Sequence, residues 1–299
     1  MSLFDRRLFV DIGKGGVGKT TVSAALALLL SQKGKRVLVA EVRTQRIPAL
    51  LGARGRGSEI APIGPNLYAL ALEPKEAMRE YALMRLRSKL LYRSLFENRF
   101  ATAFLGFIPS LPELVMLGKV LYEVREGNWD AVVLDSPATG HGLTFMGVPR
   151  ALRETVPPGA LRSEADWMQA LLVDPRTTAV NLVALPEELA VTETLELAER
   201  ARAELALPLG QVFLNRHVPE RFSDDELQSL SRGFATGMLD AAANAALAHE
   251  DRARRSTRYQ TQLRQALPLP LVTLPLLHPE RAFGRPEVEA LAERIEAAS

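Results

Sequence analysis

Cysteine is absent from this chain of 299 residues, and that absence excludes several kinds of site at once. Without thiols there is no disulfide, no thiolate zinc site, no iron–sulfur cluster and no cysteine nucleophile. Long hydrophobic runs are missing as well, since the longest one, Ala24–Leu30, is far below the ~20 residues of a membrane span. The apolar run after the N-terminal charges is too short for the core of a signal peptide. We therefore expect a soluble cytoplasmic protein.

A strong charge of either sign is also lacking. The 37 Lys and Arg residues nearly balance the 35 Asp and Glu residues, so the net charge gives no support for a nucleic-acid partner. Hydrophobic residues make up 47% of the chain and charged residues 24%, which is typical of a globular protein. At roughly 100–200 residues per domain, the length allows one large α/β domain or two small ones.

Short apolar runs typical of buried parallel strands recur along the chain and are separated mostly by helical segments. They lie at Leu8–Ile12, Lys35–Val42, Leu67–Leu72, Ala131–Leu134, Ala179–Leu185, Gln211–Leu214 and Leu271–Leu274. Alternation of strand and helix over the whole length predicts an α/β fold with a doubly wound, mostly parallel sheet.

Three stretches of the chain are too long to be simple crossovers between strands, at about 74–128, 157–176 and 219–267. Because no linker or low-complexity tract separates them from the rest, we expect one domain over residues 1–299 with these stretches as helical insertions. In the first stretch, apolar residues at helical spacing alternate with basic ones. That pattern fits packing on the sheet or on a dimer partner, and it also fits a groove for apolar segments.

Residues Gly13 to Thr20 read GKGGVGKT and satisfy the phosphate-loop pattern G-x-x-x-x-G-K-[ST] between a predicted strand and a predicted helix. The glycines let backbone N–H groups turn toward phosphate oxygens, and the helix that starts near Lys19 points its positive end at the same place. We expect Lys19 to reach the β- and γ-phosphates and the Thr20 hydroxyl to coordinate Mg²⁺. The predicted nucleotide-binding residues of this segment are Gly13, Lys14, Gly15, Gly16, Val17, Gly18, Lys19, Thr20 and Thr21.

Two aspartates stand out in the predicted strands. The apolar run that begins at Trp129 ends in Asp135, the arrangement in which a carboxylate holds Mg²⁺ through a water, so Thr20 and Asp135 are the predicted metal pair. Asp11 lies inside a predicted central strand, where an aspartate is costly unless it is paired or hydrogen-bonded. Asp11 therefore has either a structural role or a place at the strand end that faces the nucleotide.

Lys14 is not required by the general phosphate loop, and with it the segment resembles the deviant loop of the SIMIBI class, which includes ParA, MinD, the nitrogenase iron protein and ArsA. The string SPATGH from Ser136 to His141 is similar to the switch II of ArsA and of the tail-anchored-protein targeting ATPase. The resemblance implies ATP and Mg²⁺ as cofactors. It also implies a dimer in which Lys14 reaches the partner's phosphates, acting in catalysis with Lys19 and Asp135. A solvated loop lysine and a structural histidine are the alternative readings of Lys14 and His141.

The resemblance extends downstream of switch II to about residue 297. Asn215 ends a predicted strand where the ArsA-like group places an adenine-recognising asparagine, and an amide offers the base both a donor and an acceptor. The segment Pro275 to Leu277 follows the last predicted strand and could wall the base.

Switch I departs from the family pattern. Members of the family follow the second strand with an aspartate that orients the attacking water, and in this chain that position falls on Arg43. An arginine cannot act as a base and is expected near the γ-phosphate as a cation. Glu41 and Gln45 are then the nearby groups that could polarise a water. Nucleotide binding is expected to be robust, with hydrolysis slow, absent or completed by a partner subunit.

The lack of cysteine is a second departure from the family. ArsA holds arsenite by thiolates, and the eukaryotic targeting factor closes its dimer with a zinc-bound cysteine pair, so neither site is possible in this chain. We expect a homodimer or a heterodimer with an ArsA-like paralogue, no arsenite and no nucleic acid.

Three functions remain open at this stage. The first is an ATP-dependent switch whose dimer geometry controls a helical surface that binds a partner or a hydrophobic protein segment. Methionine side chains suit such an adaptable surface, and the candidates are Met78, Met84 and Met116. The second is a non-hydrolysing regulatory subunit of a heterodimer. The third is a positioning ATPase of ParA or MinD type that acts on DNA or on a membrane. Its one local basic cluster is formed by Arg252, Arg254, Arg255 and Arg258, for which a solvated helix face is the favoured interpretation over binding to DNA.

Overall fold

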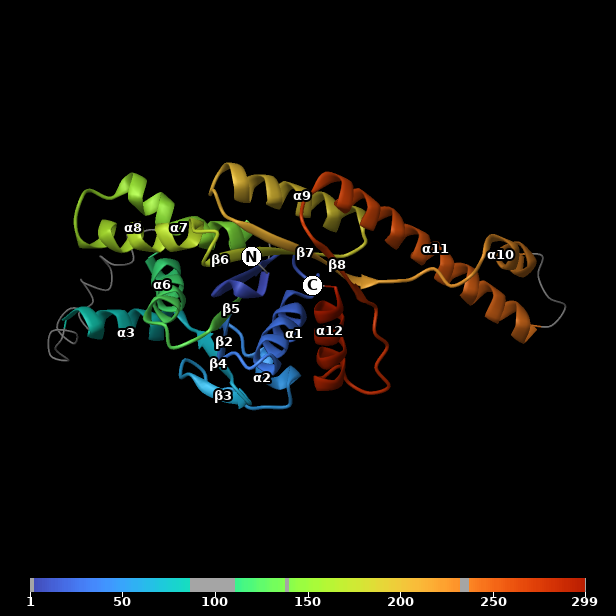
Figure 1. The fold of residues 1–299 in the computed structure, drawn as a ribbon, viewed down its shortest axis with the longest axis horizontal. Coiled ribbons are helices and arrows are strands. Elements are labelled where there is room, and N and C mark those ends of the chain that lie inside the picture. Colours follow the sequence, from blue (N-terminus) through green and yellow to red (C-terminus); the bar gives the residue numbers. More distant parts are fainter. Residues whose placement is uncertain (1–2, 87–110, 138–139, 232–236, 299) are drawn as a thin grey trace.

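The computed structural model describes residues 3–86, 111–137, 140–231 and 237–298. Its eight-stranded sheet has the order β3-β4-β2-β5-β1-β6-β7-β8 (Figure 1). Neighbouring strands are parallel except for the edge pair of β3 and β4. The strands are β1 (Leu8–Ile12), β2 (Val37–Val42), β3 (Ala61–Gly64), β4 (Leu67–Leu72), β5 (Ala131–Asp135), β6 (Thr178–Ala184), β7 (Leu209–His217) and β8 (Leu271–Pro275). The predicted doubly wound, mostly parallel sheet is confirmed.

Helices cover both faces of this sheet (Figure 1). They are α1 (Lys19–Gln32), α2 (Arg46–Leu50), α3 (Pro74–Leu86), α6 (Leu111–Glu126), α7 (Gly140–Thr155), α8 (Ala160–Val173), α9 (Glu188–Ala203), α10 (Asp224–Ser231), α11 (Gly237–Ala266) and α12 (Arg285–Ala297), after a 3-10 turn at Leu3–Asp5. The sequence analysis did not predict α2 or β3. Both are only four or five residues long, and β3 contains a proline and a glycine, so neither carries a periodic signal.

Side chains of each central strand alternate between two helical layers. In β1, Val10 belongs to a buried cluster that includes α6, α7, α8, most of α9 and the end of α11, whereas Phe9 belongs to a cluster that includes α1, α2 and α12. Burial on both faces explains why these strands are continuously apolar in the sequence. It also makes Asp11, which is fully buried in the same strand, the exception that needs an explanation.

Each of the three long stretches that we predicted to be helical insertions contains at least one helix. The first contains α3 and α6, the second α8, and the third α10 and α11. Met116 on α6 is 1% exposed and lies in the core, so it cannot contribute to an adaptable surface as the sequence suggested. Met78 packs partly against the same core, and the side chain of Met84 lies outside the described residues. No described helix is long and apolar enough to cross a bilayer.

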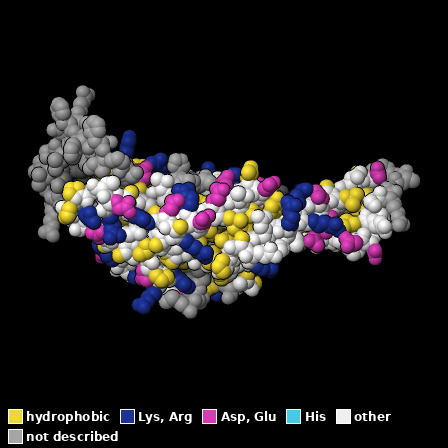
Figure 2. All heavy atoms as spheres, turned by 90° about the horizontal axis from the view of Figure 1, so that it is seen from above, with side chains coloured by type: hydrophobic (Ala, Val, Ile, Leu, Met, Phe, Trp, Pro, Cys, Tyr) yellow, Lys and Arg dark blue, Asp and Glu magenta, His cyan; other side chains and the backbone are white. Residues whose placement is uncertain are grey.

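An arm formed by α10 and α11 extends from the β8 side of the sheet (Figure 1). The C-terminal end of α11 is anchored in the core, where Leu263 is fully buried and Tyr259 is 7% exposed. The rest of α11 runs away from the sheet, and α10 folds back beside it (Figure 1). Acidic and basic side chains are intermixed along this arm (Figure 2).

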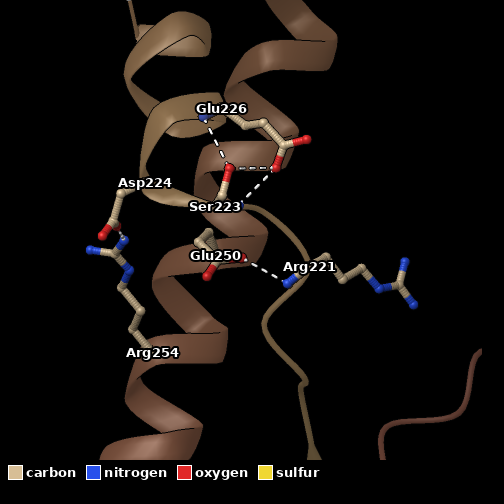
Figure 3. A network of polar contacts seen from close by, with 6 residues as sticks. All are labelled: Arg221, Ser223, Asp224, Glu226, Glu250 and Arg254. Atoms are coloured by element: carbon tan, nitrogen blue, oxygen red, sulfur yellow. Dashed lines mark hydrogen bonds and ion pairs between the residues drawn. The ribbon is translucent and has the colours of Figure 1, made fainter.

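Polar contacts hold α10 on α11 (Figure 3). Ser223 and Glu226 cap α10 reciprocally, because the Ser223 backbone N–H donates to Glu226 Oε2 at 2.8 Å and the Glu226 N–H donates to Ser223 Oγ at 3.4 Å. Asp224 forms an ion pair of 2.5 Å with Arg254 on α11. Arg255 pairs with Asp251 on its own helix. Two arginines of the predicted basic cluster are thus neutralised by neighbours, which favours the solvated helix face over a contact with DNA.

Candidate nucleotide site

The loop between β1 and α1 needs glycine at two positions. A Cβ atom at Gly13 would lie 2.3 Å from the Val183 carbonyl oxygen of β6. Gly18 has a φ of 93°, and a Cβ atom there would lie 2.3 Å from Asn215 Nδ2. Any other residue would collide with the neighbouring strand or adopt a strained backbone. The loop therefore lies directly against β6 and β7, with its N–H groups available at the start of α1.

Lys19 is fixed at the base of this loop. Its amine donates hydrogen bonds to the carbonyl oxygens of Gly13 at 2.8 Å and Lys14 at 3.1 Å, and the residue is 7% exposed. Burial lowers the pKa of Lys19, while the nearby carboxylates of Asp135 and Asp11 act in the opposite direction. A cation held in this way is positioned for the phosphates that the loop is shaped to bind.

Thr20 and Asp135, the predicted metal pair, are in direct contact. The Thr20 hydroxyl donates to Asp135 Oδ2 at 2.7 Å, and the other carboxylate oxygen, Oδ1, is buried without a hydrogen-bond partner among the described residues. Burial, together with the neighbouring carboxylates of Asp11 and Glu41, raises the pKa of Asp135 to about 7, although the hydrogen bond from Thr20 and the charge of Lys19 act in the opposite direction.

This pair fits Mg²⁺ bound together with a nucleotide. Mg²⁺ prefers oxygen ligands and usually takes one or two from the protein, with the rest from phosphates and water. No group of three His, Asp or Glu side chains suited to a metal occurs within the described ranges. A partnerless buried carboxylate oxygen next to a hydroxyl therefore suits a substrate-bound ion better than a metal cage made by the protein alone.

Asp11 is held by hydrogen bonds beneath the loop. Ser23 Oγ of α1 donates to one of its carboxylate oxygens at 2.6 Å, and Asn181 Nδ2 of β6 donates to the other at 2.9 Å. Burial raises the pKa of Asp11 to about 6, with both hydrogen bonds opposing the shift. Asp11 therefore links β1 to α1 and β6 through its hydrogen bonds. Of the two roles considered from the sequence, this arrangement favours the structural one.

A pocket of about 860 Å³ opens above these groups, between the phosphate loop and α2. Its lining brings together several predicted site residues: Gly16, Gly18, Lys19, Thr20, Thr21 and Asp135. It also contains residues that sequence reasoning did not select, among them Thr44, Arg46, Arg216 and Phe283. Gly13 and Val17 are buried in the floor of the loop, and Gly15 is exposed.

Comparison with known proteins identifies the family to which this chain belongs. The profile of the anion-transporting ATPase family matches residues 6–157, half of the chain, including the loop and Asp135. The chain belongs to the anion-transporting ATPase family. It is 32% identical to ATPase BagA of Mycobacterium tuberculosis over 242 residues, 76% of this chain and 70% of that protein.

Two further relatives widen the comparison. An Aquifex aeolicus protein named as an arsenical pump-driving ATPase is 25% identical over 334 residues, 97% of this chain and 78% of that protein. ATPase get3 of Schizosaccharomyces japonicus is 30% identical over 149 residues, 48% of this chain and 44% of that protein. The resemblance to ArsA-like ATPases drawn from the sequence is confirmed.

Switch I of this anion-transporting ATPase family member differs from the sequence-based expectation. Arg43 has a left-handed backbone, with φ of 58°, and its guanidinium points to Glu113 of α6, with 3.5 Å between Nη2 and Oε1. Arg43 does not line the phosphate pocket. In this structure Arg43 is directed toward α6 and not into the pocket, since the acidic Glu113 offers its cation a different partner.

Glu41 is equally unavailable to a water at the phosphates. The residue is 2% exposed, and its Oε1 accepts hydrogen bonds from the backbone N–H groups of Arg46 at 2.7 Å and Ile47 at 3.2 Å. Thr44 Oγ1 donates to the same oxygen at 3.1 Å. Burial raises the pKa of Glu41, while these hydrogen bonds lower it. Glu41 thus satisfies the free N–H groups at the start of α2.

The structure also locates the remaining predicted residues of switch I, the phosphate loop and switch II, which are Gln45, Lys14 and His141. Gln45 is exposed, lines the pocket and points toward the turn at Gly55, where a Cβ atom would lie 2.6 Å from Gln45 Oε1. Lys14 lies outside the pocket lining, and its amine forms an ion pair of 2.6 Å with Glu193 of α9. His141 is in the first turn of α7, and its side chain lies outside the described residues.

Asn215 uses its amide within the protein. Its Nδ2 donates to the Val17 carbonyl oxygen at 2.8 Å, and its Oδ1 accepts from the Arg216 N–H at 2.9 Å. The residue is 5% exposed and is not part of the pocket lining, whereas Arg216 and Phe283 are. In this structure Asn215 fastens β7 to the phosphate loop. The partner in this bond is 198 residues away in the sequence, and no sequence signal indicates it.

Proposed function

We propose that this protein binds ATP with Mg²⁺ in the pocket above the phosphate loop and hydrolyses it slowly as part of a dimer. The observation that carries the proposal is the contact between Thr20 and Asp135 beside Lys19, with one carboxylate oxygen buried and unpaired. Family membership supports the same activity, because the family is named for ATP hydrolysis.

The proposed roles follow from the chemistry of each side chain. Lys19 binds the β- and γ-phosphates, while Thr20 and Asp135 hold the ion. When bound, Mg²⁺ neutralises part of the phosphate charge. Asn215 supports the loop from below, and in a closed complex its amide remains the proposed contact for adenine.

Slow hydrolysis is proposed because switch I offers no free carboxylate. Glu41 is committed to the backbone of α2, and Arg43 is turned toward Glu113. Gln45 is then the side chain of this segment that can orient a water, as glutamine does in other phosphate-loop enzymes. A partner subunit that supplies a water-orienting group would raise the rate.

The dimer proposal rests on Lys14. This lysine is 33% exposed at the edge of the loop, and a salt bridge between partly exposed groups contributes little to stability. Lys14 can therefore exchange Glu193 for a phosphate bound to a second subunit at small cost. That subunit is a second copy of this chain or an ArsA-like paralogue, and the whole chain, residues 1–299, acts as one ATPase domain in the cytoplasm.

The helical segment that the dimer would control contains a cavity of about 300 Å³ between α3, α6 and α8. Apolar side chains such as Leu114, Trp167 and Met168 line it together with the ion pair of Lys119 and Glu80. We propose this surface for a partner protein or an apolar segment. The lack of cysteine argues against arsenite as the cargo.

Single-turnover hydrolysis with the purified chain tests the proposal. We expect tight binding of MgATP, slow turnover by the chain alone and faster turnover after an ArsA-like paralogue is added. Sedimentation velocity in ATP and in ADP should show a dimer favoured by ATP. Fast turnover by a monomer would contradict the composite site, and failure to bind either nucleotide would refute the proposal as a whole.

The variant Lys14→Ala separates binding from dimer-dependent hydrolysis. Because Lys14 lies outside the pocket lining, the variant should bind ATP nearly as well as the unaltered chain. Its turnover should fall by about 10- to 100-fold, the effect of one charged hydrogen bond to the reacting phosphates. The matched variant Glu193→Gln frees Lys14 without removing it and should keep its turnover. Equal turnover of the Lys14→Ala variant and the unaltered chain would show that the lysine is only a solvated loop residue.

A further inference from the structure

Arg46 is the arginine of switch I that faces the phosphate pocket. It lines the pocket with Lys19, Thr20 and Asp135, and its side chain is exposed. Within the described ranges its guanidinium makes no hydrogen bond or ion pair, and its one recorded electrostatic neighbour is the buried carboxylate of Glu41. A guanidinium without a close partner that lines an anion pocket is available for a ligand.

The backbone of Arg46 is fixed, although its guanidinium pairs with no side chain in the part of the chain that the structure describes. Arg46 is the first residue of α2, and its N–H donates to Glu41 Oε1 at 2.7 Å. Ile47, the next residue, is fully buried in the core and fixes the helix from the other side. The guanidinium therefore extends from a stable attachment point, which reduces the conformational entropy lost when it binds a ligand.

The strand order places the segment that contains Arg46 on the Asp135 side of the pocket. β2 lies next to β5, and Glu41 is in register with Asp135. Thr44, Gln45 and Arg46 follow the carboxyl end of β2 directly, whereas Arg216 follows Asn215 near the end of β7, on the far side of β1. In phosphate-loop enzymes the residues that would hold Mg²⁺ lie at the terminal-phosphate end of the pocket, and in this chain those residues are Thr20 and Asp135.

We propose that Arg46 binds the terminal phosphate of ATP within its own subunit. The inference rests on the proposed nucleotide pocket and adds a cation to it from a different segment than Lys19. Its planar set of donors matches phosphate oxygens. Arg46 thereby supplies the charge that the sequence pattern assigned to Arg43, and it makes the pocket discriminate ATP from ADP, since ADP lacks the phosphate that Arg46 contacts.

The test compares Arg46→Ala with Arg43→Ala, using fluorescent ATP and ADP analogues with Mg²⁺. The two arginines are three residues apart, yet only Arg46 lines the pocket. Arg46→Ala should lose about 10- to 100-fold in ATP affinity, the effect of a charged hydrogen bond, with little change for ADP. Arg46→Lys should recover part of the loss. Arg43→Ala should bind both nucleotides as the unaltered chain does.

Two results would overturn the proposal. The first is an unchanged ratio of ATP to ADP affinity in Arg46→Ala, whether neither affinity falls or both fall equally. The second is a larger loss of ATP affinity in Arg43→Ala than in Arg46→Ala. Thermal melts of each variant without nucleotide show whether it is folded. If Arg46→Ala does not fold, the comparison is made with Arg46→Lys instead. If Lys19→Ala also binds ATP normally, the pocket itself is wrong, which distinguishes failure of the proposed function from failure of this inference.

Discussion

Lys19→Ala should reduce ATP affinity by at least about 100-fold and leave no measurable hydrolysis, since a buried cation at the phosphates contributes several charged hydrogen bonds. The amine is held by the Gly13 and Lys14 carbonyl oxygens, so the variant loses both this cation and its two hydrogen bonds at the base of the loop. The loss should appear in isothermal titration calorimetry with MgATP and in single-turnover assays. Because Lys19 opposes the raised pKa of Asp135, its removal should also raise that pKa further.

The matched control for this variant is Lys33→Ala. Lys33 follows the C-terminal end of the same helix, α1, and forms an exposed ion pair of 2.5 Å with Glu296 of α12. Removing an exposed pair costs at most about 1 kcal/mol and should leave nucleotide binding intact. Retained ATP binding in Lys19→Ala, or an equal loss in both variants, would show that the loop does not bind phosphates as we propose.

Asp135→Asn should stabilise the protein without nucleotide while it removes Mg²⁺-dependent ATP binding. The pKa of Asp135 is raised to about 7 in the folded state from an unfolded value of 3.8, so the folded state binds more protons between these values. The contribution of this group to stability is full below pH 4 and is lost as the pH rises through 7. Asparagine avoids this loss and still accepts the hydrogen bond from Thr20. On the scale of about 1.4 kcal/mol per pKa unit, the full shift corresponds to a gain of up to about 4 kcal/mol in the free energy of unfolding at pH 8.

Urea denaturation at pH 5 and pH 8 measures this difference. The stability gain of Asp135→Asn over the unaltered chain should be larger at pH 8 than at pH 5. Asp225→Asn, at an exposed position on α10, should show no such pH-dependent gain. A loss of stability at pH 8 would mean that the carboxylate is stabilised by partners in the folded state and that its pKa is not raised.

Local patterns made the sheet and the phosphate loop predictable. The loop is one continuous segment whose glycines are required by close contacts, and Asp135 is marked by the apolar strand that precedes it. The position of Arg43 depends on Glu113, 70 residues away, and no local pattern connects the two. Arg46 lines the pocket because Glu41 caps a helix of five residues, which is too short to give a periodic signal.

The buried Asp11 shows the same limit. The sequence marked Asp11 as unusual, because a carboxylate in a central strand needs partners. It could not identify Ser23 and Asn181, which come from a helix and from a strand 170 residues away. Burial of a charge can thus be predicted from a pattern, but the groups that compensate it depend on how distant elements pack.

Two hydrogen bonds link the phosphate loop to the arm formed by α10 and α11, and the first is the one from Asn215 to the Val17 carbonyl oxygen. Asn215 lies in β7, and just past the end of that strand the Val218 N–H donates to Ser256 Oγ of α11 at 3.3 Å. The segment from Asn215 to Val218 thus joins the phosphate loop to α11 ten residues before that helix ends. α11 has 30 residues. A helix of that length extends for about 45 Å, so tilting the whole of it by ~5° would carry its far end through about 4 Å.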